Sequence, residues 1–220
     1  MKLVIFGPPG SGKGTYASRL KSKLNIATIS TGDMFREAIK QNTELGKKIK
    51  KYLDSGQLVP DEAVIKIVRN RIAKPDCKKG FILDGFPRTV EQAKALETAV
   101  KIDAIINLLI PEQIIIERLS NRRTCRDCRE IYNLKTLKPK KEGICDKCGG
   151  PLIQRKDDTI SVIKERFQVF ERQTRPLIKH YKNKTPLVNM VCNRLPPENV
   201  IEQIIRELKK LNLTKQSRSG

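Results

Sequence analysis

The stretch Leu3-Val4-Ile5-Phe6-Gly7-Pro8-Pro9-Gly10-Ser11-Gly12-Lys13-Gly14-Thr15 decides the fold class. Its first four residues are apolar and predict a buried strand, and Ala17, Leu20 and Leu24 continue the chain at helical spacing. A strand, a glycine-rich turn, a lysine and a helix together make a phosphate-binding loop (P-loop), in which backbone N–H groups point at phosphate oxygens. The order of the glycines does not match the G-x-G-x-x-G pattern of dinucleotide sites. The alternative is that this stretch is only a glycine-rich turn, with no phosphate ligand.

The residues after the glycines indicate how a nucleotide would be held. Lys13 is placed to reach the β and γ phosphates. The strict motif has Ser or Thr directly after the lysine to bind Mg²⁺, whereas this chain has Gly14 and only then Thr15. We therefore expect Mg²⁺ to be held through phosphates, waters and an outlying carboxylate, with Asp84 as the candidate acting through water.

Short apolar runs alternate with helical patterns along the rest of the chain, which predicts an α/β fold with a parallel sheet. Thr89, with Gln92 three residues later, forms the pattern of a capping box that opens a helix. Two segments, 30–59 and 121–158, break the alternation and are interpreted as insertions on the sheet core. The strands that this pattern predicts are 3–6, 81–83, 104–110 and 187–191.

Composition excludes several classes of protein. The 220 residues are 38% hydrophobic, which suffices for a core, yet no run approaches the 18 apolar residues of a membrane span. The N-terminal apolar run is too short for a secretory signal, so we expect a cytoplasmic protein. A single histidine, His180, leaves little room for Ser–His–Asp hydrolysis; we expect it to be a surface or packing residue. The net charge of +21 is spread along the chain and favours phosphate ligands over nucleic acid, without excluding the latter.

Four of the six cysteines predict a metal site. Cys125-x2-Cys128 and Cys145-x2-Cys148 form two knuckles with the spacing of a tetrahedral zinc centre, and Gly149 and Gly150 help the chain turn around the sulfurs. Four protein ligands leave no open position, so the metal would be structural. Disulfides, unliganded thiols, or iron in place of zinc are the alternatives. The remaining pair, Cys77 and Cys192, is interpreted as ordinary thiols.

The motif Asp84-Gly85-Phe86-Pro87-Arg88, together with the P-loop, Thr31-Gly32-Asp33 and Arg155-Lys156-Asp157-Asp158, resembles the adenylate kinases. More closely, the chain resembles the long-lid, zinc-binding form of the adenylate kinases, which belong to the nucleoside monophosphate kinase family. The resemblance implies a P-loop NTPase-type core with a five-stranded parallel sheet (1–29, 59–120 and 159–213). It also implies a small helical AMP-binding segment (30–58), a zinc-ribbon-like lid (121–158) and a disordered tail (214–220).

The resemblance also assigns site residues, position by position. The ATP-binding residues would be Gly10, Ser11, Gly12, Lys13, Gly14, Thr15, Arg118, Arg122, Ile131, Tyr132 and Leu195. The AMP-binding residues would be Thr31, Arg36, Gln57, Leu58, Val59, Gly85, Phe86, Arg88, Gln92, Arg155 and Arg166. The catalytic residues would be Lys13, Arg88, Arg122, Arg155 and Arg166. Asp157 and Asp158 resemble carboxylates at the lid hinge.

The implied reaction is reversible, Mg²⁺-dependent transfer of a phosphoryl group from ATP to AMP, giving two ADP. It requires electrostatic stabilisation by arginine and lysine rather than a general base, which suits a chain with one histidine. Closure of the AMP-binding segment and the lid would exclude water. We expect a monomer with structural zinc that contacts neither membrane nor nucleic acid. The alternatives are a uridylate/cytidylate or GTP-dependent kinase, and a nucleic-acid-binding zinc ribbon that uses ATP as a switch.

Overall fold

Five parallel strands form the central sheet in a computed structural model that describes residues 1–192 and 196–213. The spatial order is β2-β3-β1-β4-β8, so the P-loop strand β1 is central. In register, Leu3 lies beside Ile82 on one side and Ala104 on the other. The α/β prediction with a five-stranded parallel sheet is confirmed. The strands are β1 (Lys2–Phe6), β2 (Ala27–Ser30), β3 (Phe81–Asp84), β4 (Ala104–Leu109) and β8 (Leu187–Val191).

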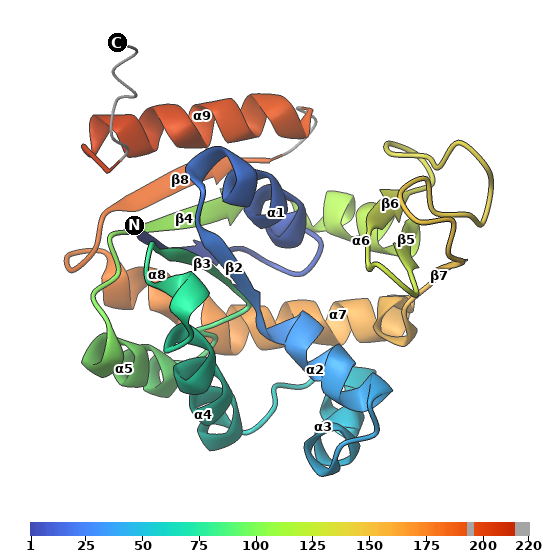
Figure 1. Cartoon of the computed structure of the whole chain (residues 1–220), viewed down its shortest axis with the longest axis horizontal. Coiled ribbons are helices and arrows are strands. Elements are labelled where there is room, and N and C mark those ends of the chain that lie inside the picture. The colour runs from blue at the N-terminus through green and yellow to red at the C-terminus, as the bar shows by residue number, and fades with distance from the viewer. Residues whose placement is uncertain (193–195, 214–220) are drawn as a thin grey trace.

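Helices cover both faces of this sheet (Figure 1). One face packs on α1 and α9, and the other packs on α4, α5 and α8. Each face buries its own cluster of aliphatic residues, with Ile106 on the first and Ile105 on the second, both fully buried. These helices are α1 (Lys13–Leu24), α4 (Asp61–Ile72), α5 (Val90–Ala99), α8 (Pro176–Tyr181) and α9 (Pro197–Lys210).

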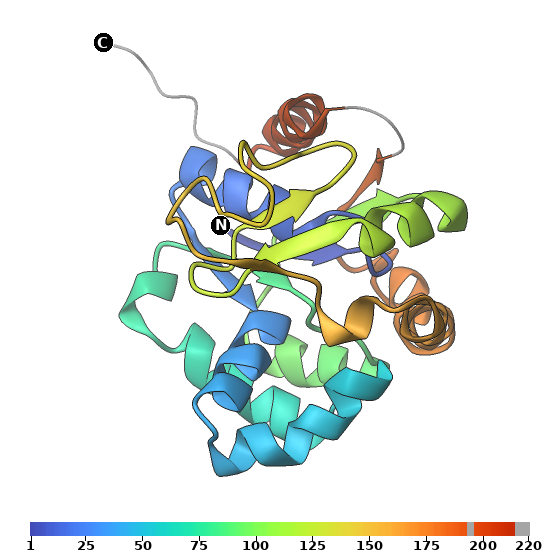
Figure 2. The same cartoon turned by 90° about the vertical axis from the view of Figure 1, so that its right-hand side faces the viewer.

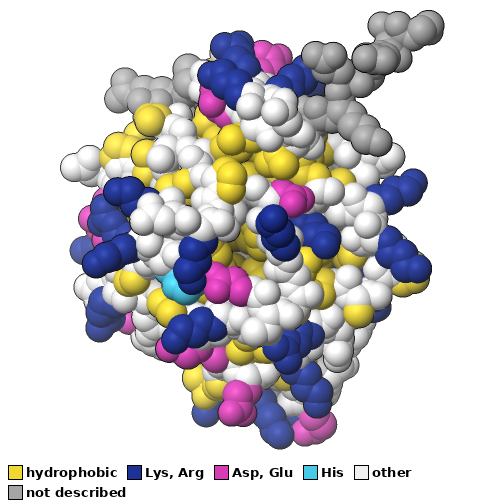
Figure 3. Space-filling view, turned by 90° about the vertical axis from the view of Figure 1, so that its left-hand side faces the viewer, with side chains coloured by type: hydrophobic (Ala, Val, Ile, Leu, Met, Phe, Trp, Pro, Cys, Tyr) yellow, Lys and Arg dark blue, Asp and Glu magenta, His cyan; other side chains and the backbone are white. Residues whose placement is uncertain are grey.

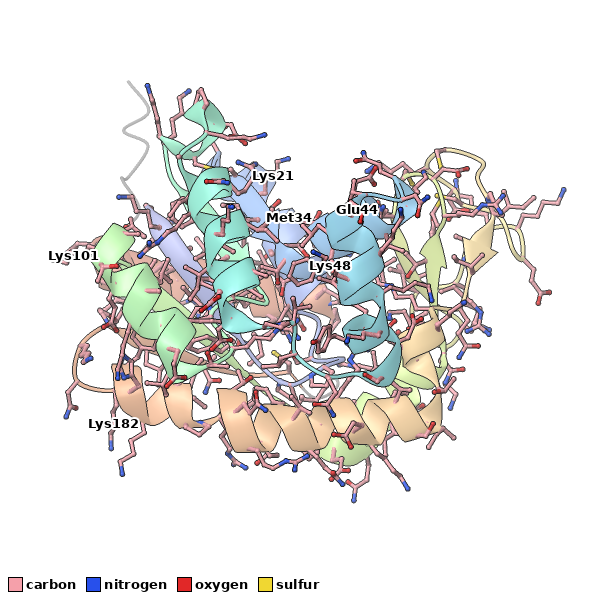
Figure 4. The ribbon with its side chains drawn as sticks, turned by 90° about the horizontal axis from the view of Figure 1, so that it is seen from below. Lys21, Met34, Glu44, Lys48, Lys101 and Lys182 are labelled. Carbon is pink, nitrogen blue, oxygen red and sulfur yellow. The ribbon has the colours of Figure 1, made fainter. Side chains whose placement is uncertain are left out.

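Two helices follow β2 and form most of the segment 30–58, which the resemblance predicts to be helical and to bind AMP. They are α2 (Thr31–Lys40), capped by the Ser30 hydroxyl, and α3 (Glu44–Ser55), capped by Thr43. Met34 of α2 lies between α3 and α4 (Figure 4). Strand β2, with the sequence ATIS, is absent from the strands predicted by apolar pattern. It is short and half polar, and it is a strand because β3 pairs with it.

The lid forms a small antiparallel sheet of its own, in the order β6-β5-β7. Its strands are β5 (Arg122–Cys125), β6 (Ile131–Asn133) and β7 (Leu152–Ile153). Figure 2 faces this sheet, with α6 (Glu112–Ser120) leading into it and α7 (Ile160–Val169) leading away. The buried hydrophobic residues of the lid are Cys125, Tyr132 and Cys145, with Leu152 packed against them. The lid therefore has little apolar material with which to hold its fold.

The positive charge is distributed over the surface. Lys and Arg side chains are scattered over the face in Figure 3, with Asp and Glu between them. Lys21, Lys48, Lys101 and Lys182 come from separate parts of the chain (Figure 4). No helix in the described ranges is long and apolar enough to cross a membrane. The expected disordered tail, 214–220, lies outside the described residues.

Candidate active site and metal centre

A cleft of about 1030 Å³ opens at the carboxyl-terminal edge of the central sheet, where β1, β2 and β3 end. Ligands of parallel α/β sheets bind at this edge, because the loops after the strands meet there. Most of the predicted site residues line it. They are Gly10, Gly12, Lys13, Gly14, Thr15, Arg36, Leu58, Asp84, Gly85, Arg88, Arg118, Arg122, Ile131, Tyr132, Arg155 and Arg166.

The other predicted residues lie outside this lining. Gln57 and Val59 line an adjoining pocket of about 510 Å³, which Leu58 also lines. Ser11, Thr31, Phe86 and Gln92 are buried beneath the wall of the cleft. Leu195 lies outside the described residues. The binding roles of all these residues stay predictions.

The P-loop wraps around the amino group of Lys13. Its Nζ donates hydrogen bonds to the carbonyl oxygens of Gly7, at 2.7 Å, and Pro8, at 2.9 Å. Gly12, with φ of 95°, precedes α1, and no side chain caps the helix there. The first N–H groups of α1 are therefore left for an anion. A β-carbon at Gly12 would lie 2.9 Å from the Tyr16 ring, which explains why the turn requires glycine.

Burial makes the lysine and carboxylate at the floor of the cleft electrostatically unusual. Desolvation lowers the pKa of Lys13 to about 7, although the nearby Asp84 opposes the shift. Desolvation likewise raises the pKa of the Asp84 carboxyl, with Lys13 opposing. The position of a β-carbon at Gly14 is 3.5 Å from Asp84 Oδ2, so this carboxylate adjoins the P-loop. An oxygen ligand at this place fits the predicted water-mediated contact to Mg²⁺.

Arginines from several elements line the cleft, and aspartates hold three of them in place. Arg36 on α2 pairs with Asp33 at 2.6 Å. Arg122 on β5 binds both carboxylate oxygens of Asp158, at 2.5 and 2.8 Å. Arg166 on α7 donates to Asp157 at 2.8 Å. Asp33, Asp157 and Asp158 thus fix the positions of three arginines that line the cleft.

Two arginines have neither a close carboxylate nor an exposed position. Arg88 donates from Nε to the Gly85 carbonyl at 2.9 Å, and Arg155 donates from Nε to the Thr124 hydroxyl at 2.9 Å. Burial, and then repulsion from Arg166, lower the pKa of Arg88 to about 10. Burial, and then repulsion from Arg122, lower the pKa of Arg155 to about 9. Both stay charged at neutral pH, so an anion that enters the cleft is attracted by cations with little solvent around them.

Buried polar atoms without partners also face this region. Within the described part of the chain, Arg36 Nε has no hydrogen-bond acceptor, and the Ser11 hydroxyl in the P-loop has no partner. Buried polar groups are normally satisfied, so such atoms at a cleft wall indicate a place for a ligand. An oxyanion supplies acceptors for Arg36.

The candidate metal centre consists of the two cysteine knuckles of the lid. The Sγ atoms of Cys125, Cys128, Cys145 and Cys148 lie within 4.8 Å of one another, and two of the S···S distances are 3.5 Å. Tetrahedral Zn²⁺ with Zn–S bonds of about 2.3 Å separates its sulfurs by about 3.8 Å. A disulfide needs about 2.05 Å. The donor set therefore fits zinc, and all four thiols are free of disulfide bonds.

The turn after the second knuckle requires glycine at two positions, in agreement with the prediction that Gly149 and Gly150 help the chain turn around the sulfurs. Gly149 has φ of 73°, a left-handed conformation. A β-carbon at Gly150 would lie 3.1 Å from Cys125 Sγ and 2.3 Å from Asp127 Oδ2. Larger side chains are therefore excluded at Gly150.

Tyr132 connects the metal centre to the cleft. It lines the cleft, but its hydroxyl lies 3.5 Å from Cys145 Sγ and accepts a hydrogen bond from the backbone N–H of Asp146 at 2.8 Å. The side chain therefore serves as part of the lid core. Its predicted contact with ATP stays a prediction.

Some residues that line the cleft were not among the predicted site residues. Arg19 pairs with Glu198 of α9 at one end of the cleft, and Asp33 lies in the wall beside Arg36. Arg19 is four residues after Thr15, on the same face of α1, and this helical spacing is a signal that could have identified it. Glu198 had no such signal, since α9 is distant in sequence.

The remaining predictions for single residues agree with the structure. Cys77 and Cys192 are buried thiols outside the metal cluster. His180 packs beside Tyr181, and its Nε2 lies 2.8 Å from Glu97 Oε1. His180 is therefore a packing residue at the edge of the helical layer.

Comparison with known proteins agrees with this site. The family model described as adenylate kinase matches residues 5–186. An adenylate kinase of Archaeoglobus fulgidus is 53% identical over 189 residues, covering 84% of this chain and 87% of that protein. An adenylate kinase of Carboxydothermus hydrogenoformans is 49% identical over 215 residues, covering 96% and 100%. The cysteine cluster is consistent with the long-lid, zinc-binding form. Because the family model and these relatives span most of the chain, this protein belongs to the adenylate kinase family.

Proposed function

We propose that the protein transfers the terminal phosphoryl group of ATP to AMP, reversibly, giving two ADP, with the cleft as the site of transfer. Family membership makes it a phosphotransferase acting on adenine nucleotides with Mg²⁺; the division of work among residues is our proposal. The observation that supports it best is the arrangement of one cleft between a P-loop and two groups of arginines. Such a cage neutralises two polyanions that would otherwise repel each other.

The ATP phosphates would occupy the P-loop, where the N–H groups of α1 and Lys13 meet them. The pKa of Lys13, about 7 in the free protein, rises when the polyphosphate enters, because opposite charge favours the protonated form. Arg122, Arg155 and Arg166 would then stabilise charge on the equatorial oxygens of the group in transit. Since these cations are already held by hydrogen bonds, little reorganisation is needed at the moment of reaction.

The AMP phosphate would lie between Arg36 and Arg88, on the side of the cleft opposite the P-loop. Arg36 comes from α2 and Arg88 from the loop after β3, so both depend on the Thr31–Gly85 contact, in which the Thr31 hydroxyl donates to the Gly85 carbonyl at 2.9 Å. Guanidinium groups bind phosphate oxygens in pairs, which orients the acceptor.

Mg²⁺, bound with ATP, would supply charge neutralisation between the phosphates. Asp84, beside Gly14 and Lys13, is the carboxylate that would face it through water. Zn²⁺ in the lid would be structural, since four thiolates complete its coordination.

Closure of the lid (121–158) over the AMP-binding segment (30–58) would exclude water from the reaction. In the structure Arg129 of the lid pairs with Glu37 of α2 at 2.6 Å, and Gln57 donates to Glu165 of α7 at 2.8 Å. These contacts between segments distant in sequence support a closed arrangement. We further propose a cytoplasmic monomer that contacts neither membrane nor nucleic acid. The intermixed positive and negative side chains on the face in Figure 3 support the absence of a nucleic-acid surface there.

Acceptor-dependent ADP formation tests the proposal. The purified protein is given Mg·ATP with AMP, CMP, UMP or GMP, and turnover is expected with AMP at the highest kcat/KM. Preference for CMP or UMP would transfer the chain to the uridylate/cytidylate kinases. Turnover that needs RNA and no monophosphate would favour the zinc-ribbon alternative.

A further inference from the structure

A hydrogen-bonded chain that begins outside the cleft ends on the main chain of Arg88. Asp61, the first residue of α4, accepts from the Thr89 hydroxyl at 2.6 Å and from Gln92 Nε2 at 2.7 Å. Gln92 Oε1 in turn accepts from the backbone N–H of Arg88 at 2.8 Å. This differs from the expected capping box, in which the Gln92 side chain would return to the N–H of Thr89. The glutamine instead reaches one residue further back, to Arg88.

We propose that Asp61 is a positioning residue for the phosphoryl acceptor: it fixes the orientation of the Gln92 amide, which fixes the main chain of Arg88. A carboxylate only accepts hydrogen bonds, whereas an amide has a donor end and an acceptor end. Asp61 therefore draws the NH₂ of Gln92 toward itself, and the oxygen is left facing the Arg88 N–H. The proposal rests on the role proposed above for Arg88.

The other polar groups of Arg88 are also held by the protein. Its carbonyl accepts from the Thr174 hydroxyl at 3.0 Å, and its Nε donates to Gly85. Thr174 ends a π-helical turn, Phe170–Thr174, between α7 and α8. The N–H bond to Gln92 is thus the third constraint on this residue. Asp61, which lines the adjoining pocket and not the cleft, sets that constraint, since Gln92 is 1% exposed and is shielded from bulk solvent.

Substitution of Asp61 by Asn tests the idea at constant size. An amide at position 61 faces two donors, the Thr89 O–H and the Gln92 NH₂, with a single acceptor oxygen. One donor therefore loses its acceptor, or the Gln92 amide turns and presents NH₂ to the Arg88 N–H. We expect KM for AMP to rise about tenfold in Asp61→Asn, which is less than the roughly 10²-fold that a misplacement of about 1 Å can cost. KM for ATP should change less than twofold.

Glu62→Gln is the matched control. Glu62 is exposed and lies in the same first turn of α4, so Glu62→Gln removes the same negative charge from the same helix terminus as Asp61→Asn does. A general effect on α4 would appear in both variants, whereas loss of positioning appears only in Asp61→Asn. Equal KM values for AMP in Asp61→Asn, Glu62→Gln and the parent would overturn the proposal. Arg88→Lys separates failure of the proposed role of Arg88 from failure of the role of Asp61. If Arg88→Lys leaves KM for AMP unchanged, the proposed role of Arg88 itself is wrong.

A second measurement is independent of nucleotide binding. In the double variant Asp61→Asn with Gln92→Glu, the carboxylate at position 92 accepts from both the Arg88 N–H and the amide at position 61, whose oxygen still accepts from Thr89. Every donor again has an acceptor. Thermal unfolding without nucleotide should show a melting temperature for the pair above that of either single variant. Additive losses in the pair would show that the polarity of these bonds does not hold the network.

Discussion

The central sheet and the lid of this kinase are stabilised in different ways. The sheet buries two large aliphatic clusters against helices on both faces, whereas the lid buries Cys125, Tyr132 and Cys145 with Leu152 beside them. Hydrophobic burial grows with the apolar area removed from water, so the sheet is stable through its size. The lid has too little of this area, so we expect it to depend on a metal held by its four thiols.

This difference has a functional meaning. The P-loop and Arg88 stand on the sheet and its first loops, while Arg122 and Arg155 belong to the lid. A lid that is stiffened by a metal rather than by packing against the core can change its position as a unit and keep its own geometry.

Removal of the metal should unfold the lid and leave the sheet intact. Structural zinc contributes about 10 kcal/mol or more in small domains of this kind. After treatment with a strong chelator, we expect fast hydrogen exchange across 121–158 and unchanged protection in β1, β3 and β4. Cys145→Ser should behave in the same way, with the buried Cys77→Ser as control. Unchanged protection of the lid after metal loss would remove the contrast.

Lys13→Met should separate activity from stability. Loss of a cation at the transferring phosphoryl group lowers kcat about 10³-fold. Stability should not fall, because the pKa of Lys13 is lowered to about 7, which means that the fold disfavours the charged form. Between pH 7 and pH 10.5 the folded state binds fewer protons than the unfolded state. The unfavourable contribution of the charged lysine to folding stability is therefore fully present below pH 7 and decreases as the pH rises toward 10.5.

Melting curves at pH 6 and pH 9 check this sign. Lys13→Met should gain most at pH 6, whereas Lys21→Met, an exposed lysine on the same helix, should gain at neither pH. A melting temperature lowered at pH 6 in Lys13→Met would contradict the account of the buried charge.

The same substitution in the two regions should have unequal effects. Ile106→Ala opens a cavity in the central sheet and should cost about 2–5 kcal/mol of unfolding free energy. Ile153→Ala in β7 removes a side chain whose residue is 43% exposed, and should cost about 0.5 kcal/mol. Denaturant titration followed by circular dichroism measures both. Equal losses would show that the lid depends on packing after all.

Binding of ATP should take up a proton. At pH 8 the Lys13 amine, with its pKa near 7, is mostly neutral in the free protein, and the polyphosphate raises that pKa. Uptake of up to about one proton is expected by linkage. Calorimetric titration in two buffers of different ionisation enthalpy measures it, and Lys13→Met should abolish it. Proton release in the parent would be incompatible with the lowered pKa.

The smallest effect is expected for the contact between the lid and the AMP-binding segment. Arg129 and Glu37 are partly exposed, so their pair should contribute about 0.2–1 kcal/mol to the closed arrangement and less at high salt. A double-mutant cycle of Arg129→Ala and Glu37→Gln, read by energy transfer between probes on α3 and the lid, measures the coupling. Lys147→Ala breaks a pair within the lid and serves as control. Zero coupling at low salt would show that this pair does not hold the closed arrangement.

Much of the fold was predictable because its signals are local. The apolar runs at β1 and β3 are continuous, and those at β4 and β8 are each interrupted by one asparagine. β1, β3 and β4 are buried on both faces, as such runs predict, whereas β8 alternates between buried and exposed residues. β2 was missed in that pattern because its sequence, ATIS, alternates apolar and polar residues and is only four residues long. Its pairing with β3 depends on residues more than fifty positions later.

The candidate site divides in the same way. The P-loop and the cysteine knuckles are contiguous motifs, so their residue types and spacing predicted phosphate binding and metal binding. The arginines were assigned through resemblance to the family. Asp61 and Glu198 had no motif, because their importance comes from neighbours that the fold brings to them, whereas Arg19 had only its helical spacing from Thr15 as a signal.

The sequence by itself determined the inventory of chemistry: a phosphate loop, a set of arginines, four thiols in two knuckles, and the periodicities that select an α/β sheet. These depend on neighbours a few residues apart. Only the tertiary structure decided that Lys13 loses most of its water, that Tyr132 turns its hydroxyl to a cysteine, and that Asp61 orients Gln92 toward Arg88. Desolvation and hydrogen-bond direction depend on atoms from distant segments, and those atoms meet only when the chain is folded.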